Sequence, residues 1–279
     1  MSTDSKMYLK EALNFGTKYL SDRKVEDSRN EVLFLLSFLA DKSYTDIALD
    51  KTTKIDKDKF ISYLKRRAKG EPSAYITGFT EFMSLPFKVN KNVLIPRQDT
   101  ELLVEKLIET NIKNVEILDI CTGSGCIAVS LAKYISSKVT AVDISKEALK
   151  ICKENATLNN VSVTALNDDI LNPRLNYDKY DIIVSNPPYI RPGVILTLDK
   201  TVKDFEPLIA LDGGEDGLIF YKKISAFAKG HLNENGLLAF EIGYDQKDDV
   251  INILKEHNFK DIICHKDYNH NDRVVMAKL

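Results

Sequence analysis

The feature that most constrains the fold of this chain is a regular alternation of strand-like and helical stretches after residue 114. Seven short apolar runs have the length and composition of buried strands, and helical stretches separate most of them. Such an alternation predicts a mostly parallel α/β sheet, doubly wound and seven-stranded, with helices on both faces. Only a turn separates the last two runs, so we expect the final strand to be antiparallel. The runs are 115–120, 139–142, 161–166, 181–185, 237–242, 259–264 and 274–277.

The residues before this alternation have a different pattern. Apolar side chains recur at helical spacing within 8–20, 32–40 and 60–68, and Gly70 and Pro72 end the last stretch. Short β-like runs follow from 74 to 95, and a helix capped at Asp99–Thr100 is expected to run to about Thr110. We therefore predict a small helical bundle at 1–72, a β-hairpin linker at 73–97 and the α/β domain at 98–279.

Charge and composition narrow the possible partners. The chain has 279 residues, a length suited to two domains, and a net charge of −2. Residues 1–70 carry 15 Lys and Arg against 11 Asp and Glu, a bias too mild to predict a phosphate-binding surface. We therefore expect no nucleic-acid partner, and we expect a monomer.

The apolar runs and the cysteines indicate where the protein is located and whether it binds a metal ion. The longest apolar run, 32–40, is far short of a membrane span, and the N-terminus lacks the apolar core of a secretory signal. Four cysteines without paired spacing suit the reducing cytoplasm. Neither these cysteines nor the four scattered histidines form a pattern of metal ligands, so we predict no metal site.

A Gly-x-Gly loop follows the first strand of the predicted sheet. In 117–125 (ILDICTGSG), Gly123 and Gly125 let the backbone approach a ligand and direct helix N-terminal N–H groups at it. The next strand ends at Asp143, where a carboxylate can accept both ribose hydroxyls, and the third is followed by Asp168, Asp169 and Ile170, suited to an adenine. A tight turn and a helix cap at Asp143 are the structural alternatives. This pattern predicts a nucleoside site without distinguishing a redox cofactor from a methyl donor.

The fourth strand leads directly into Asn186-Pro-Pro-Tyr189. In a doubly wound sheet this loop shares the switch-point crevice with the Gly-x-Gly loop. The Asn186 side-chain oxygen and the Pro187 carbonyl can accept both hydrogens of a planar –NH₂ group, which aims its lone pair at an electrophilic methyl. A Tyr189 face can pack on that group and attract a sulfonium charge. Hydride transfer would explain the Gly-x-Gly loop but not this tetrapeptide.

These residues resemble S-adenosylmethionine methyltransferases that act on planar –NH₂ nitrogens. Further stretches are similar to the HemK/PrmC-type release factor glutamine methyltransferases, and the resemblance covers the whole chain, although the helical N-terminal part matches only in character. The matching stretches are 70–78 (GEPSAYITG), 93–102 (VLIPRQDTEL), 186–190 (NPPYI), 205–207 (FEP), 210–218 (ALDGGEDGL), 241–243 (EIG) and 272–275 (DRVV).

The resemblance implies a Rossmann-like methyltransferase sheet and a substrate, the glutamine of the Gly-Gly-Gln motif in bacterial release factors, whose methylation modulates translation termination. Cys121 stands where the family usually has glycine, which matters if this position needs a positive φ. The resemblance implies S-adenosylhomocysteine as the product. It implies that Asn186, Pro187 and Tyr189 are catalytic, and that all four residues of 186–189, Pro188 included, bind the substrate. The implied cofactor residues are Asp119, Cys121, Thr122, Gly123, Ser124, Gly125, Asp143, Asp169, Ile170 and Asn186.

Two other functions use the same features. An amino methyltransferase acting on adenine N6 or guanine N2 of a nucleic acid has the same tetrapeptide, and a noncatalytic module can keep the fold without turnover. Arg97, Asp99 and Glu101 either line the crevice or form surface ion pairs. The loop 213–217 is either a flap over the substrate or a turn that needs its glycines.

Overall fold

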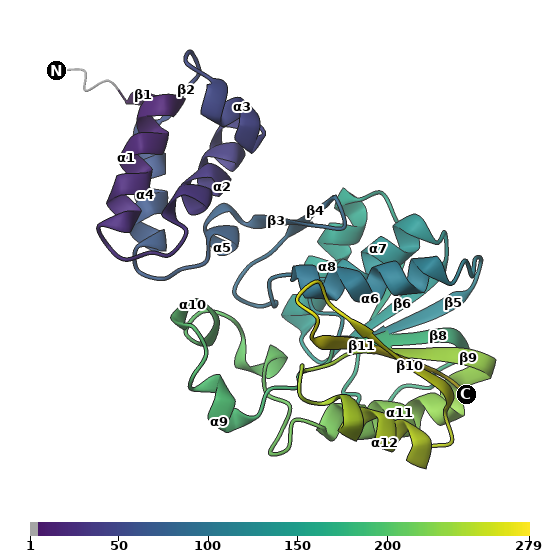
Figure 1. Ribbon diagram of the computed structural model, residues 1–279. Coiled ribbons are helices and arrows are strands. Elements are labelled where there is room, and N and C mark those ends of the chain that lie inside the picture. The colour runs from purple at the N-terminus through teal and green to yellow at the C-terminus, as the bar shows by residue number, and fades with distance from the viewer. Residues whose placement is uncertain (1–4) are drawn as a thin grey trace. The chain divides into compact units, whose positions relative to one another are not determined.

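The computed structural model describes residues 5–279 and divides them into two units. One unit holds the described residues as far as Gly78 together with Asp199–Phe205, and the other holds Phe79–Leu198 and Glu206–Leu279 (Figure 1). Among the residues that the structure describes, no helix is long and apolar enough to cross a membrane.

The first unit is a helical bundle with a two-stranded ribbon. Its helices meet around a core that includes Leu9, Val32, Leu36 and Phe60, all fully buried. The Ser43 and Asp56 side chains cap α3 and α4 by accepting hydrogen bonds from the third residue beyond each. The helices are α1 (Leu9–Ser21), α2 (Ser28–Ala40), α3 (Tyr44–Leu49), α4 (Lys57–Arg67), α5 (Ser73–Thr77) and α10 (Lys200–Lys203); the antiparallel strands are β1 (Lys6–Tyr8) and β2 (Lys54–Asp56).

A buried ion pair joins three helices of this unit. The Arg67 side chain of α4 pairs with Glu31 Oε2 of α2 at 2.8 Å and donates to Glu31 Oε1 at 3.0 Å, and the Ser73 hydroxyl at the start of α5 also donates to Oε2. Because all three groups are mostly out of solvent, the contact fixes how α2, α4 and α5 pack, and we give it a structural role.

The second unit contains the seven-stranded sheet that the sequence predicts. The strand order is β10-β11-β9-β8-β5-β6-β7, parallel from β9 to β7, with β11 antiparallel to both of its neighbours. The antiparallel final strand is therefore confirmed. The strands are β5 (Glu116–Ile120), β6 (Lys138–Asp143), β7 (Val163–Asn167), β8 (Tyr180–Ser185), β9 (Leu232–Glu241), β10 (Lys260–Lys266) and β11 (Asp272–Lys278).

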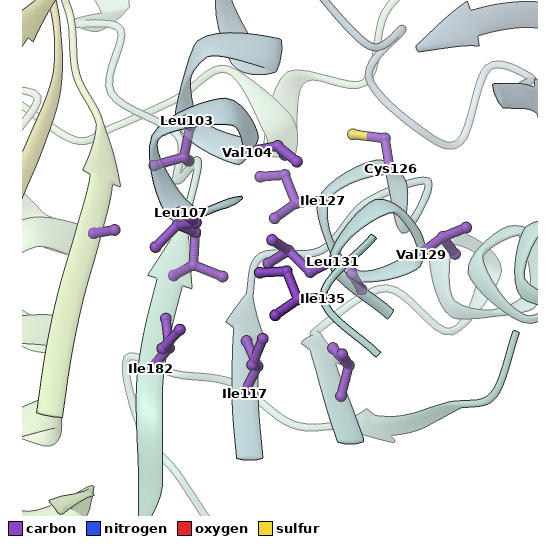
Figure 2. Close-up of a cluster of buried hydrophobic side chains, with 14 of the residues drawn as sticks. Leu103, Val104, Leu107, Ile117, Cys126, Ile127, Val129, Leu131, Ile135 and Ile182 are labelled. Carbon is purple, nitrogen blue, oxygen red and sulfur yellow. The ribbon is translucent and has the colours of Figure 1, made fainter. Parts of the chain in front are cut away.

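Alternate side chains of each central strand point to opposite faces, and helices cover both (Figure 1). Ile117 and Ile182 pack under α6 and α7, as Figure 2 shows, whereas Leu118 and Ile183 pack under α11 and α12. The helices of this unit are α6 (Gln98–Glu109), α7 (Cys126–Tyr134), α8 (Lys146–Leu158), α9 (Pro192–Ile195), α11 (Ile219–His231) and α12 (Lys247–Glu256), with a 3₁₀ turn η1 (Leu208–Ala210).

Two local expectations are wrong, and the predicted hairpin occupies a shorter stretch than 73–97. Residues 73–77 form helix α5 and no β structure, because Pro72 starts a single turn and Gly78 ends it at φ +80°. The hairpin lies at β3 (Phe79–Phe82) and β4 (Leu85–Lys88), and its turn residues Met83 and Ser84 both have positive φ without glycine. Arg97 is the N-cap of α6, so the Asp99–Thr100 cap is wrong.

Candidate functional site

The β5 and β8 strands are neighbours in the sheet, and the loops at their carboxyl ends meet at the point where the strand order reverses. A cavity of about 230 Å³ opens there. Its walls include eight residues expected from the sequence: Cys121, Gly123, Asp143, Asp168, Asp169, Ile170, Asn186 and Pro188. The other expected residues, Asp119, Thr122, Ser124, Gly125, Pro187 and Tyr189, lie outside its lining.

Gly125 shapes the loop between β5 and α7. It is the N-cap of α7 at φ +80°, and a Cβ there would lie 2.6 Å from Cys152 Sγ. Gly123 has φ +54°, but nothing lies within 4 Å of its hypothetical Cβ. Gly123 is therefore needed for its conformation alone, whereas Gly125 is needed both for its conformation and for the close approach of α8.

Cys121 occupies the left-handed region as well, at φ +62°. A side chain at such a φ is strained, so the departure from glycine at this position has a conformational cost. Burial and the nearby carboxylates of Asp143 and Asp119 raise the pKa of the Cys121 thiol well above its ordinary value. The thiol is therefore neutral at the cavity wall.

Asp143 sits at the end of β6 and holds the Gly-x-Gly loop. Its Oδ2 accepts from the Gly123 N–H at 2.8 Å, and its Oδ1 accepts from the Ser145 N–H at 2.9 Å. The cap of α8 is Ser145, whose hydroxyl accepts from the Ala148 N–H, so the alternative of Asp143 as the helix cap is wrong. Burial raises the Asp143 pKa, and its carboxyl group faces the cavity.

Asp119 lies behind the same loop with no exposed surface. Its Oδ2 accepts from the Thr122 hydroxyl at 2.5 Å and from the Ala128 N–H at 3.2 Å. Its Oδ1 has no hydrogen-bond partner within the described part of the chain. Burial raises the Asp119 pKa to about 7, so this carboxyl group titrates near neutrality.

Asp168 and Asp169 differ in role although they are adjacent. The Asp168 Oδ2 accepts from the Arg174 and Leu175 N–H groups and the Tyr177 hydroxyl, at 2.9 to 3.1 Å. Burial acts to raise its pKa, but these hydrogen bonds outweigh it and lower the pKa. Asp168 therefore organises the loop after β7, and all three of Asp168, Asp169 and Ile170 line the cavity.

Asn186 follows β8, and its side-chain amide has a defined neighbour. The Asn186 Nδ2 donates to Thr100 Oγ1 at 3.1 Å, and Thr100 is a buried residue in the first turn of α6. The Tyr189 hydroxyl donates to Glu241 Oε1 at 3.4 Å, and burial raises the Tyr189 pKa above its ordinary value. Thr100 was expected only as a helix cap, and the contact with Asn186 joins residues 86 positions apart.

Residues for which the sequence predicts no role pack closely against Tyr189 of the tetrapeptide. The Gln246 side chain donates to the Tyr189 and Gly217 carbonyls at 3.1 and 3.2 Å and accepts from the Gly243 N–H at 3.0 Å. A Cβ at Gly213 would lie 2.6 Å from Tyr189 Cα, and one at Gly217 would lie 2.5 Å from the Tyr189 oxygen. Gly213 and Gly217 are therefore needed for close packing against Tyr189, and the positive φ values of Gly214 (+81°) and Gly217 (+74°) show that the turn needs glycine as well.

The expected crevice residues of α6 do not line the cavity. Arg97 forms an ion pair with the buried Glu206. Asp99 pairs with Arg273 at 3.3 Å, and Glu101 accepts from the Met83 N–H of the hairpin turn at 2.5 Å. Within residues 5–279, no group of three His, Cys, Asp or Glu side chains is arranged to hold a metal ion.

Comparison with known proteins identifies relatives over nearly the whole chain. Residues 97–202 match the methyltransferase small domain family, and residues 11–78 match the PrmC N-terminal domain family. The release factor glutamine methyltransferase of Clostridium acetobutylicum is 41% identical, covering 97% of this chain and 98% of that protein. The enzyme of that name from Geobacter sulfurreducens is 36% identical, covering 97% and 96%.

Two solved structures share the fold. A methyltransferase from Pyrococcus furiosus matches with a TM-score of 0.51 and 19% identity, covering 71% of this chain and 90% of that chain. A T. thermophilus 16S rRNA N2 G1207 methyltransferase in complex with AdoMet and guanosine matches with a TM-score of 0.53 and 19% identity, covering 72% and 49%. At this identity the similarity shows a common α/β methyltransferase fold.

Proposed function

We propose that this chain, which belongs to the release factor glutamine methyltransferase family, transfers a methyl group from S-adenosylmethionine to a glutamine side-chain amide of a release factor. Membership rests on 41% identity over almost the full length of both proteins. The glutamine of the Gly-Gly-Gln motif is the proposed acceptor. The nucleic-acid reading has the same tetrapeptide, but the relatives with high coverage carry the release-factor name.

The residues around the cavity fit S-adenosylmethionine. The unpartnered Asp119 Oδ1 is a buried acceptor, which suits the ammonium of an amino acid moiety. The Asp143 carboxylate suits ribose hydroxyls, and Ile170 with Asp169 suits an adenine face and edge. When bound, this cofactor supplies an electrophilic methyl group. Residues 121–125 with Asp119, Asp143, Asp169 and Ile170 would hold it.

The chain's own contribution to the reaction comes from the loop after β8. An amide nitrogen is a poor nucleophile because its lone pair is delocalised into the carbonyl. The Asn186 Oδ1 and the Pro187 carbonyl accept the two amide hydrogens, which orients the nitrogen and favours its pyramidal form in the transition state. Proline at 187 and 188 restricts the backbone, so these acceptors are preorganised. The amide proton lost after methylation passes to water.

One observation carries this proposal. The Nδ2 of Asn186 is engaged by Thr100, and Asn186 lines the cavity beside Gly123 and Asp143. The amide oxygen is therefore left for an –NH₂ donor at the place where a methyl donor fits. We also propose that residues 1–72 recognise the release factor and that 73–97 link this domain to 98–279.

The test combines the purified chain with labelled S-adenosylmethionine and a bacterial release factor, and locates the label by peptide mass spectrometry. One methyl group on the Gly-Gly-Gln glutamine is expected. A release factor with that glutamine replaced is expected to stay unlabelled, as is the native factor with the Asn186→Ala enzyme. Labelling of the replaced factor, or of added nucleic acid in place of the native factor, would sink the proposal.

A further inference from the structure

A buried asparagine of α8 joins the Gly-x-Gly loop to the hairpin, although it lies outside the lining of the cavity. Asn155 has no exposed surface. Its Nδ2 donates to the Ser124 carbonyl at 2.9 Å and to the Lys88 carbonyl at 3.0 Å, and its Oδ1 accepts from the Lys88 N–H at 2.7 Å. Ser124 is the middle residue of the Gly-x-Gly loop, and Lys88 is the last residue of β4. One side chain thus holds two backbone segments that are distant in the sequence.

The Asn155 amide satisfies all of these groups in one orientation only. A side-chain amide has two N–H donors on its nitrogen and an acceptor oxygen, and both ends are used here. A half-turn of the amide would set its oxygen against two carbonyl oxygens and its nitrogen against an N–H group. Because the side chain is fully buried, each lost bond would leave a polar group unpaired away from water. The amide is therefore fixed in direction as well as in place.

Both segments that Asn155 holds lead directly into the walls of the cavity. Gly123, which precedes Ser124, is a lining residue. On the other side, β4 ends at Lys88, and residues 92–94 line the cavity a few positions further along the chain. Asn155 therefore sets how the Gly-x-Gly loop lies relative to the segment that follows the hairpin.

The peptide unit between Ser124 and Gly125 is fixed at both of its polar ends. Its carbonyl accepts from Asn155, and its N–H, which belongs to Gly125, donates to the Thr122 carbonyl at 2.8 Å. Cys152, which would clash with a Cβ at Gly125, is three residues before Asn155 and lies on the same face of α8. The close approach of α8 and the Asn155 hydrogen bond therefore act together on the peptide that begins α7.

We propose that Asn155 is a positioning residue for the cofactor, which holds the Gly-x-Gly loop against the hairpin in the conformation that binds S-adenosylmethionine. The inference rests on the proposed function for the identity of this cofactor. Asn155 acts through the backbone at Ser124 and Lys88. Because one amide holds both segments, cofactor binding and the hairpin contact are coupled, and the coupling is reciprocal. Occupancy of the cavity strengthens the contact with Lys88, and loss of the Asn155 donors weakens cofactor affinity.

The first experiment compares aspartate variants at two asparagines of the same helix. Asn159 is also buried on α8, and its Nδ2 donates to the Pro86 carbonyl of the hairpin at 2.9 Å and to the Asn155 carbonyl at 3.0 Å. Both of its donors are thereby used, so none is left for the Gly-x-Gly loop. Asn155→Asp and Asn159→Asp each keep the shape of the side chain and remove two N–H donors. A protonated carboxyl group would restore only one of them.

Calorimetry with S-adenosylmethionine alone measures the Kd of each variant. Asn155→Asp is expected to raise Kd about tenfold, the effect of one lost orienting hydrogen bond, whereas Asn159→Asp is expected to stay within about threefold. Since S-adenosylmethionine carries a net positive charge, a new carboxylate would by itself strengthen binding, so a weaker affinity reports on the lost donors. At saturating cofactor, kcat for release-factor methylation is expected to stay within about threefold of the wild type in both variants. Equal Kd values for the two variants would refute the inference.

The second experiment needs no substitution. Hydrogen exchange of the wild type is measured with and without saturating S-adenosylmethionine. The Lys88 N–H is expected to exchange about threefold or more slowly with the cofactor, because its acceptor on Asn155 is held more firmly. The control is the Asn271 N–H, which also donates to a side-chain oxygen, Asp267 Oδ1 at 2.9 Å, in the turn between β10 and β11. Its exchange is expected to stay unchanged. Equal slowing of both amides, or slowing of neither, would overturn the coupling.

These measurements separate the inference from the proposed function. If the wild type binds S-adenosylmethionine and methylates no release factor, the proposed function fails, while the Kd values and exchange rates still decide the role of Asn155. If the release factor is methylated and the two variants have the same Kd, the inference alone fails. A wild type that binds no S-adenosylmethionine would overturn both. If Asn155→Asp does not fold, the exchange of Lys88 in the wild type decides by itself.

Discussion

Replacing Gly125 by alanine is expected to destabilise the α/β unit far more than the same change at Gly123, two positions earlier in the loop. Both residues have positive φ, so alanine costs each about 1–2 kcal/mol in free energy of unfolding. At Gly123 nothing else is added, because the new Cβ meets no atom within 4 Å. At Gly125 the Cβ would lie 2.6 Å from Cys152 Sγ and 3.2 Å from Cys152 Cα. Overpacking of that kind adds about 1–3 kcal/mol.

Equilibrium urea unfolding measures the difference, with circular dichroism and tyrosine fluorescence as signals because the chain has twelve tyrosines and no tryptophan. Cys152→Ala removes the nearest clashing atom but leaves Cβ and Cα in place. In a double-mutant cycle it should therefore recover part of the Gly125→Ala penalty and none of the Gly123→Ala penalty. Equal penalties for the two glycines, or no coupling between positions 125 and 152, would show that the close approach of α8 does not determine this loop.

Three further predictions concern the cofactor loops. Because the Asp119 pKa is raised to about 7, its carboxyl group is protonated below that pH and negatively charged above it. The affinity for S-adenosylmethionine, measured by calorimetry, should therefore rise through about pH 7 in the wild type. It should stay constant with pH in Asp119→Asn. Cys121→Gly relieves a positive φ that Cys121→Ala keeps, so the glycine variant should be the more stable by about 1 kcal/mol in urea unfolding. Asp168→Asn should lower the free energy of unfolding, measured by thermal denaturation, by about 2 kcal/mol, because a neutral amide oxygen cannot satisfy the N–H groups of the loop after β7. Asp169→Asn should lower it by less.

The sheet was predictable because its signal is local. An apolar run of four to six residues marks each strand of the sheet, and the loop from Gly123 to Gly125 marks one strand-to-helix junction by itself. The hairpin turn is different. Met83 and Ser84 have positive φ without any residue that favours it, and their turn is held by Glu101 and the Tyr134 hydroxyl, which binds the Met83 oxygen at 2.6 Å. Such tertiary contacts leave no mark in the local sequence.

The residues of the site also fall into those that could be predicted from the sequence and those that could not. Residues proposed to bind a ligand through their own chemistry, such as Asp143 and Asn186, line the cavity at strand ends and could be found from their positions in the alternation. Cys121 could be suspected only from its departure from glycine, and its φ of +62° gives the reason. Gln246 could not be found, because its role depends on bringing together carbonyls that lie 57 and 29 residues away.

This division has a physical basis in what the reaction requires. Ligand-facing groups need only the right chemistry at a strand end, and the sheet supplies their location. Holding the Asn186 side-chain amide in one orientation requires hydrogen-bond partners of fixed direction, and these come from residues outside the loop after β8. Thr100 of α6 accepts from the Asn186 Nδ2, and Gln246 at the start of α12 donates to the Tyr189 carbonyl. The elements that cover the sheet therefore do more than bury its faces, since their ends hold the loop that contains Asn186, the residue proposed to receive the substrate amide.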